Sequence, residues 1–167
     1  MAIVLVGGGA RSGKSRYALH LARHHGDRMV FLATAEAGDH EMAARIAKHR
    51  AERPSEFLTV EEPLEIAKVI REQHADVIVI DCATVWLSNV MLLFGRDVDA
   101  DTESLLAALQ ASEARIILVT NEVGCGIIPE TTLGRDFRDR AGILNQRVAA
   151  IADEVYWMVF GVPMRVK

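Results

Sequence analysis

Residues 3–15 read IVLVGGGARSGKS, four apolar residues followed by a glycine-rich segment that ends in lysine and serine. A continuous run of branched apolar residues is typical of a strand that is buried on both faces. Residues 8–15 fit the pattern G-x-x-x-x-G-K-[ST], in which glycines let backbone N–H groups point at phosphate oxygens. Because a helical pattern begins directly afterwards, near Lys14, we favour a phosphate-binding loop (P-loop) over a chance glycine-rich turn.

The parts of this loop have different expected roles. Lys14 would neutralise charge on the β and γ phosphates of a nucleoside triphosphate, and the Ser15 hydroxyl would bind Mg²⁺. The N-terminus of the following helix adds a partial positive charge. The residues predicted to contact nucleotide phosphates are therefore Gly8, Gly9, Ala10, Arg11, Ser12, Gly13, Lys14 and Ser15.

Strand-like apolar runs alternate with helical patterns along the rest of the chain. Strands are expected at 3–6, 29–33, 57–60, 76–80, 116–120, 155–160 and 164–166, and helices at 14–25, 39–52, 64–74, 85–94, 103–112 and 133–151. Only residues 95–102 form a polar, loop-like stretch of any length, so a single domain over residues 1–167 is predicted. This alternation predicts an α/β fold of the RecA-like P-loop NTPase type, with a mostly parallel sheet covered by helices on both faces.

Composition excludes several classes of protein. The formal net charge of −4 over 167 residues provides no basic field for nucleic acid, which argues against a RecA-like ATPase that acts on DNA or RNA. No apolar stretch approaches the ~20 residues of a membrane span. The two cysteines, Cys82 and Cys125, form no CxxC pair, and a secretory leader is not apparent, so a reduced, cytoplasmic protein is expected.

Two carboxylates compete for the second position in the Mg²⁺ site. Asp81 ends the apolar run VIVI, and Glu122 follows the run IILVTN. The carboxyl ends of parallel strands meet at one edge of a sheet, where ligands bind. Asp81 is the preferred ligand to Mg²⁺ in this interpretation, and a turn aspartate that only ends a strand is the alternative.

One histidine lies among several cations. Within 41–50 (EMAARIAKHR), Arg45 and His49 are four residues apart and share a helical face, and Arg50 and Arg53 follow. Neighbouring positive charge keeps an imidazole neutral, and a neutral imidazole can attack phosphorus. From these residues alone, a solvated helix face with many charges remains the alternative.

Five segments together resemble the bifunctional cobinamide kinase and cobinamide-phosphate guanylyltransferase family of cobalamin biosynthesis. They are GGARSGKS at 8–15, EMAARIAKHRAERP at 41–54, TVEEP at 59–63, TNEVGCGIIPE at 120–130 and FRDRAGILNQRVAAIADEV at 137–155. The resemblance covers essentially the whole chain. It implies that a nucleoside triphosphate, ATP or GTP, phosphorylates adenosylcobinamide. GTP then donates GMP to that phosphate through a histidine that carries GMP, giving adenosylcobinamide-GDP and pyrophosphate.

The resemblance also implies particular residues. His49 matches the family histidine, since Arg53 and Pro54 complete the H-x-x-x-R-P pattern. Beyond the P-loop, the nucleotide contacts implied by matching position are Thr34, Ala35, Glu36, Arg50, Ala51, Glu52, Arg53, Glu61 and Asp81. The resemblance further implies a corrinoid substrate, a catalytic role for His49 and a homotrimer. A catalytic role for Lys14, and Mg²⁺ bound by Ser15 and Asp81, are expected from the P-loop pattern and the strand end described above.

Two rival functions remain open at this point. A small-molecule kinase without nucleotidyl transfer would use the P-loop and Asp81 but would give His49 no chemistry. A GTPase switch would need an N-K-x-D motif after a strand, and residues 120–123 read TNEV instead.

Overall fold

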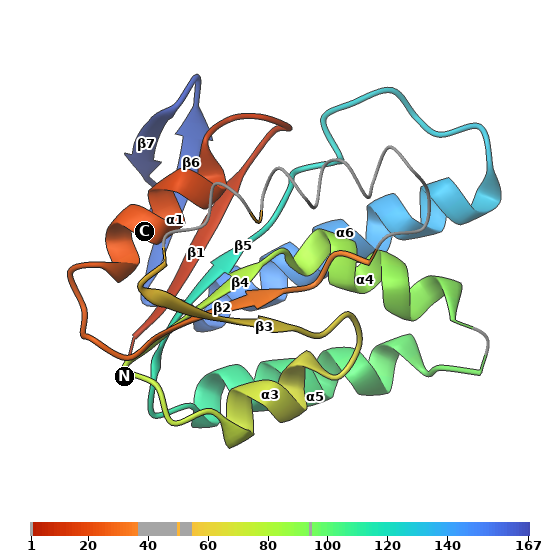
Figure 1. Cartoon of the computed structure of the whole chain (residues 1–167). Coiled ribbons are helices and arrows are strands. Elements are labelled where there is room, and N and C mark those ends of the chain that lie inside the picture. Colours follow the sequence, from red (N-terminus) through yellow and green to blue (C-terminus); the bar gives the residue numbers. More distant parts are fainter. Residues whose placement is uncertain (1, 37–49, 51–54, 94) are drawn as a thin grey trace.

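The computed structural model describes residues 2–36, 50, 55–93 and 95–167. Its strands form one seven-stranded sheet in the order β3-β2-β4-β5-β1-β6-β7 (Figure 1). The strands are β1 (Ile3–Gly8), β2 (Met29–Ala33), β3 (Phe57–Glu61), β4 (Val77–Asp81), β5 (Arg115–Val119), β6 (Glu154–Val159) and β7 (Val162–Arg165). All neighbouring strands pair in parallel except β6 and β7, which form an antiparallel hairpin at one edge.

Helices cover both faces of the sheet, as the sequence predicts (Figure 1). The described helices are α1 (Lys14–Ala22), α3 (Ile66–Glu72), α4 (Ala83–Leu92), α5 (Val98–Ala111) and α6 (Thr132–Ile151). Alternate strand residues such as Val6 and Val79 face α1 on one side. Their neighbours, such as Leu5 and Ile80, belong to the cluster that includes α3, α4, α5 and α6 on the other.

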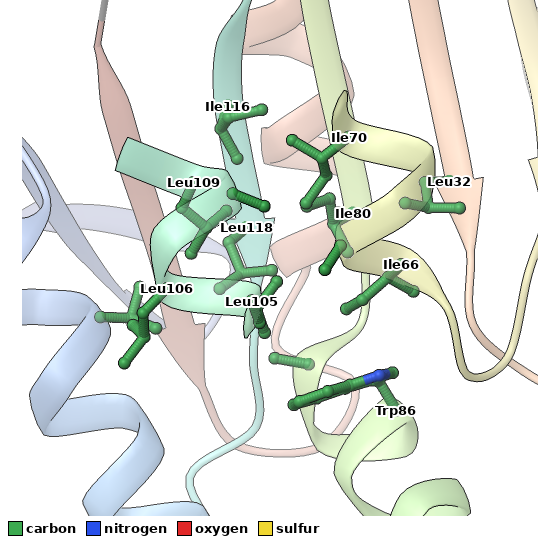
Figure 2. Packing of buried hydrophobic residues seen from close by; sticks show 14 of the residues in the cluster. Leu32, Ile66, Ile70, Ile80, Trp86, Leu105, Leu106, Leu109, Ile116 and Leu118 are labelled. Carbon is green, nitrogen blue, oxygen red and sulfur yellow. The ribbon is translucent and has the colours of Figure 1, made fainter. Parts of the chain in front are cut away.

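The larger of the two hydrophobic clusters lies between the sheet and helices α3, α4, α5 and α6. Figure 2 shows Leu105 and Leu109 of α5 and Ile66 of α3 packed over the strands. Trp86 of α4 is 1% exposed, and its indole Nε1 donates to the carbonyl oxygen of Leu64 at 2.9 Å. A buried indole with a satisfied N–H stabilises the fold and ties α4 to the segment before α3.

Residues 98–102 contradict one expectation, because they begin helix α5 instead of continuing a loop. The carboxylate of Asp97 accepts from the backbone N–H groups of Asp99 and Ala100, at 3.1 Å each. Acidic residues are favoured at a helix N-terminus, where they satisfy free N–H groups and meet the positive end of the dipole. The polar character that suggested a loop is thus the composition of a capped first turn.

The predicted helix at 39–52 lies outside the described residues apart from Arg50. Within the described part of the chain, no helix combines the length and apolarity needed to cross a bilayer.

Candidate functional site

The phosphate loop connects β1 to α1 at the carboxyl edge of the sheet. Gly13 is the N-cap of α1 and adopts the left-handed conformation, with φ of 90°. An L-residue pays an energetic penalty in that conformation, and glycine does not. Since Gly13 has no side chain to cap the helix, the N–H groups of the first turn are available to an anion.

Lys14 occupies the interior of this loop. Its side chain is buried, and Nζ donates to the carbonyl oxygen of Gly9 at 2.6 Å and to Oγ of Ser12 at 3.5 Å. Burial lowers the pKa of Lys14, and the nearby Cys82 and Asp81 oppose that shift. These two contacts hold the ammonium group near oxygen atoms of its own loop, as expected of a phosphate-binding lysine.

Asp81 ends β4 on the same edge as the phosphate loop. The strand order places β5 between β1 and β4, so Asp81 lies two strands from Gly8. The fully buried Thr34 supports this end of β4: its backbone N–H donates to the Asp81 carbonyl oxygen at 3.1 Å. The Thr34 hydroxyl also accepts from the Cys82 N–H at 2.8 Å and donates to the Cys82 carbonyl oxygen at 2.9 Å. Thr34 thus fixes the backbone on both sides of the Asp81–Cys82 junction.

Two of the predicted nucleotide contacts pair with each other beyond β2. Arg50 Nε donates to Glu61 Oε1 at 2.7 Å, and a second hydrogen bond joins Arg50 Nη2 to Glu61 Oε2. This pairing raises the pKa of the Arg50 guanidinium, mainly through the side-chain hydrogen bond. Both side chains are exposed, and exposed ion pairs contribute little to stability, so a ligand can rearrange this pair at small cost.

Glu122 lies near the loop but uses its carboxylate locally. Its backbone N–H donates to the Gly8 carbonyl oxygen at 3.1 Å, which fastens the end of β5 to the phosphate loop. Its Oε1 accepts from the Gly124 N–H at 2.5 Å. This contact holds the Glu122 carboxylate within its own turn.

The donor set fits Mg²⁺ that is held jointly with a substrate. Among the described residues, no group of three or more His, Cys, Asp or Glu side chains could hold a metal ion by itself. Magnesium usually keeps several waters and binds one or two carboxylates together with substrate phosphates. Asp81 and the half-buried Ser15 match that smaller protein contribution.

The predicted residues differ in how far the structure describes them. The P-loop, Asp81 and 34–36, which follows β2, lie at one edge of the sheet. Arg50 and Glu61 lie at the same edge, where Glu61 ends β3 beside Ala33 of β2. Four predicted residues lie outside the described part of the chain, and their roles stay predictions: His49, Ala51, Glu52 and Arg53.

Sequence reasoning assigned no role to three polar residues that meet beside this edge. Thr84, Thr120 and Asn145 come from α4, the end of β5 and α6, and they are linked by hydrogen bonds. Thr120 and Asn145 lie within segments that carry the family resemblance, but their hydrogen bond joins positions 25 residues apart, and no local sequence pattern predicts it.

The fold resembles ATPases of bacterial secretion systems. An ATPase from the type III secretion system of pathogenic bacteria matches with a TM-score of 0.61 and 14% identity, over 95% of this chain and 51% of that one. The VirB11 ATPase from the Brucella suis type IV secretion system matches with a TM-score of 0.52 and 10% identity, over 99% of this chain and 47% of that one. This chain spans about half the length of each, and at such identities the likeness concerns the fold alone. It confirms the predicted P-loop NTPase fold.

Comparison of sequences identifies the family as well as the fold. Residues 4–166 match the family model described as "Cobinamide kinase / cobinamide phosphate guanyltransferase". The chain is 44% identical over 166 residues to the bifunctional adenosylcobalamin biosynthesis protein CobP of Pseudomonas aeruginosa, covering 98% of this chain and 96% of the relative. It is 41% identical over 186 residues to the bifunctional adenosylcobalamin biosynthesis protein CobU of Escherichia coli, covering 99% of each. With the P-loop and sheet described above, these full-length matches show that the chain belongs to the cobinamide kinase / cobinamide phosphate guanyltransferase family.

Proposed function

We propose that this protein catalyses two successive transfers in cobalamin biosynthesis. The first phosphorylates the aminopropanol hydroxyl of adenosylcobinamide, with ATP or GTP as donor. The second transfers GMP from GTP to that phosphate, giving adenosylcobinamide-GDP and pyrophosphate. The observation that carries this proposal is a buried lysine within a phosphate loop, in a chain that matches the family over nearly its full length.

The phosphate loop and Asp81 would act in both reactions. Residues 8–15 would hold the triphosphate with backbone N–H groups and the Lys14 ammonium. Ser15 and Asp81 would hold Mg²⁺, which when bound neutralises phosphate charge and orients the reacting groups. Asp81 is chosen because it ends β4 close enough to the P-loop for its charge to oppose the lowering of the Lys14 pKa.

His49 is the proposed nucleophile of the second reaction. Its neutral imidazole nitrogen would attack the α phosphorus of GTP, forming a P–N bond while the bond to the bridging oxygen breaks and pyrophosphate leaves. The imidazole proton goes to solvent. An oxygen of the corrinoid phosphate would then attack the same phosphorus, the P–N bond would break, and the released His49 imidazole would take a proton back from solvent. Nucleotide contacts are proposed from Thr34, Ala35, Glu36, Glu61 and the segment from Arg50 through Ala51 and Glu52 to Arg53.

The proposal extends to the state of the protein in the cell. We take residues 1–167 as one P-loop nucleotide-binding domain of a cytoplasmic homotrimer that binds a corrinoid and nucleotides, without a nucleic-acid partner. The absence of a basic field and the family resemblance support this interpretation.

Product analysis tests the function directly. Protein, Mg²⁺, GTP labelled at the α phosphorus and adenosylcobinamide should yield labelled adenosylcobinamide-GDP. Without the corrinoid, label should remain on the protein through an acid-labile, base-stable bond. His49→Ala should lose that label and keep phosphorylation of adenosylcobinamide. If the parent phosphorylates the corrinoid but transfers no label, the protein is a kinase alone, which is the second candidate.

A further inference from the structure

A closed ring of hydrogen bonds lies at the carboxyl end of β5. The Thr120 hydroxyl donates to Asn145 Oδ1 at 2.7 Å and lies 3.2 Å from the Thr84 hydroxyl. The Asn121 backbone N–H donates to the Thr84 hydroxyl oxygen at 2.7 Å, and Asn145 Nδ2 donates to the Asn121 carbonyl oxygen at 3.3 Å. We call these four residues, Thr84, Thr120, Asn121 and Asn145, the β5 ring.

The chemistry of its members fixes the direction of every bond in the β5 ring. A carbonyl oxygen only accepts, so the nitrogen of the Asn145 amide must face Asn121 and its oxygen must face Thr120. The Thr120 hydroxyl therefore donates its single proton to Asn145, and the Thr84 hydroxyl must donate to Thr120. Thr84 and Thr120 are buried, and each hydroxyl has both a donor and an acceptor partner. Asn121 takes part only through its backbone, so the ring is broken when Thr84, Thr120 or Asn145 is replaced by an apolar residue.

The segment held by the ring touches the nucleotide site on two sides. Next to Asn121, the Glu122 N–H donates to the carbonyl oxygen of Gly8, the first residue of the P-loop. On the other side, Asn121 Nδ2 approaches Cys82 Sγ at 3.7 Å, directly after Asp81. The β5 ring therefore fixes both the N–H and the carbonyl group of Asn121 by hydrogen bonds. Asn121 follows β5, which lies between the strand of the P-loop and the strand of Asp81, the proposed ligand to Mg²⁺.

From this arrangement we propose that Asn145 is a positioning residue for phosphoryl transfer. It lies on α6 and acts through Thr120 and the backbone of Asn121, which together set the end of β5 against Gly8 and Cys82. The inference rests on the proposed function, because it assigns the ring a part in that reaction. Nucleotide binding depends on many backbone amides of the loop, so it should tolerate a small shift at β5. The transfer step depends on alignment, and small misplacements there lower the rate ~100-fold.

Two kinds of variant test the proposal. Asn145→Asp keeps an acceptor for Thr120 but replaces the donor to Asn121 with a second oxygen, so that two oxygens face each other. Thr120→Val removes the hydroxyl and keeps the shape, whereas Thr120→Ser keeps the hydroxyl and removes the methyl group. Asp76→Ala is the control: it removes several hydrogen bonds to Asp27 and Arg28 at the opposite end of β4.

The measurements are kcat and KM for phosphorylation of adenosylcobinamide by ATP, thermal midpoints, and amide exchange over residues 120–122. We expect Asn145→Asp and Thr120→Val to lower kcat ~10- to 100-fold with KM for ATP within ~3-fold, and to speed exchange. Thr120→Ser should stay within ~3-fold of the parent in kcat although it loses a buried methyl group. Asp76→Ala should lower the thermal midpoint and leave kcat unchanged.

The possible outcomes separate this inference from the proposed function. An active parent, with kcat retained in folded Asn145→Asp and Thr120→Val, would overturn the positioning role alone. Equal losses of kcat in Thr120→Val and Thr120→Ser, in proportion to their stability, would also overturn it, because a purely structural role predicts that result. A parent protein that forms no phosphorylated corrinoid would overturn the proposed function and the positioning role together.

Discussion

The ammonium nitrogen of Lys14 lies 2.6 Å from the carbonyl oxygen of Gly9, so the P-loop lysine donates to its own loop. A bound phosphate would offer this ammonium group charged oxygens instead of a neutral carbonyl, and charged acceptors give stronger hydrogen bonds. Nucleotide binding is therefore expected to replace the Gly9 carbonyl oxygen by a phosphate oxygen as the acceptor for Lys14.

Lys14→Met should therefore weaken nucleotide binding without unfolding the protein. Methionine is unbranched and only one atom shorter than lysine, so it suits the buried position, but it cannot donate a hydrogen bond. Losing one hydrogen bond to a charged group costs about 1.5–3 kcal/mol, which is ~10- to 100-fold in affinity. Titration calorimetry with GTP and ATP measures the change, and circular dichroism checks the fold. A folded Lys14→Met that binds both nucleotides like the parent would contradict the assignment of the site.

Gly13→Ala should destabilise the P-loop through its backbone. A Cβ at Gly13 would meet Gly161 Cα at 3.5 Å and Arg16 Nη2 at 3.6 Å, which are ordinary contacts, so space is not the obstacle. The left-handed φ of 90° is the obstacle, at about 1–2 kcal/mol. Chemical denaturation should show that loss, and the affinity for GTP should fall with it.

Gly142→Ala is the matched control for this glycine. It lies within α6, and a Cβ there meets nothing within 4 Å. Alanine in a helix interior is favoured over glycine by roughly 0.5–1 kcal/mol, so this variant should be more stable than the parent. Equal destabilisation by both substitutions would show that the conformation of Gly13 is not the cause.

Because of Asp76, the folded protein should lose stability when the pH becomes acidic. Hydrogen bonds from the Arg28 side chain and backbone lower the pKa of Asp76 from 3.8 to about 2. A carboxyl whose pKa is lower in the folded state stabilises the protein above its unfolded pKa. That contribution is lost as pH falls from about 4 through about 2. Urea denaturation at pH 6 and pH 2.5 should show a smaller difference for Asp76→Asn than for the parent.

The two cysteines should differ sharply in reactivity. Cys82 is 7% exposed, and burial raises the pKa of its thiol to about 11, whereas Cys125 is exposed. Thiol reagents attack the thiolate, so Cys82 should react only on unfolding. A chromogenic disulfide at pH 8 should titrate one thiol per chain in the native protein and two in urea. Fast reaction of the native Cys125→Ser variant would contradict the burial of Cys82.

The sheet could be predicted from the sequence because its central strands, β1, β2, β4 and β5, contain continuous apolar runs. The expected strand at 29–33 coincides with β2, and most other elements differ only by a few residues at their ends. The first turn of α5 was missed because its capping aspartate was grouped with polar loop residues. Elements with a strong local pattern were therefore predictable, and mixed boundaries were less so.

The candidate site likewise combines residues that a local pattern predicts with residues that only the folded structure brings together. The P-loop is a contiguous pattern, and Asp81 follows from the end of an apolar strand. The β5 ring joins Thr84 to Thr120 over 36 positions and Thr120 to Asn145 over 25, and such contacts arise only when α4 and α6 pack against the sheet. The Arg50–Glu61 pair likewise depends on where β3 ends, which spacing alone does not reveal.

The position of β5 in the sheet has a last consequence. Because one strand separates the lysine-bearing loop from the strand of Asp81, the two are held about 10 Å apart by backbone pairing, at ~4.8 Å per strand. Substitutions of side chains leave that width unchanged. Relatives that use a different acceptor molecule would therefore have to differ in the segments that follow the strands, while the spacing between the P-loop and the Asp81 strand stays constant.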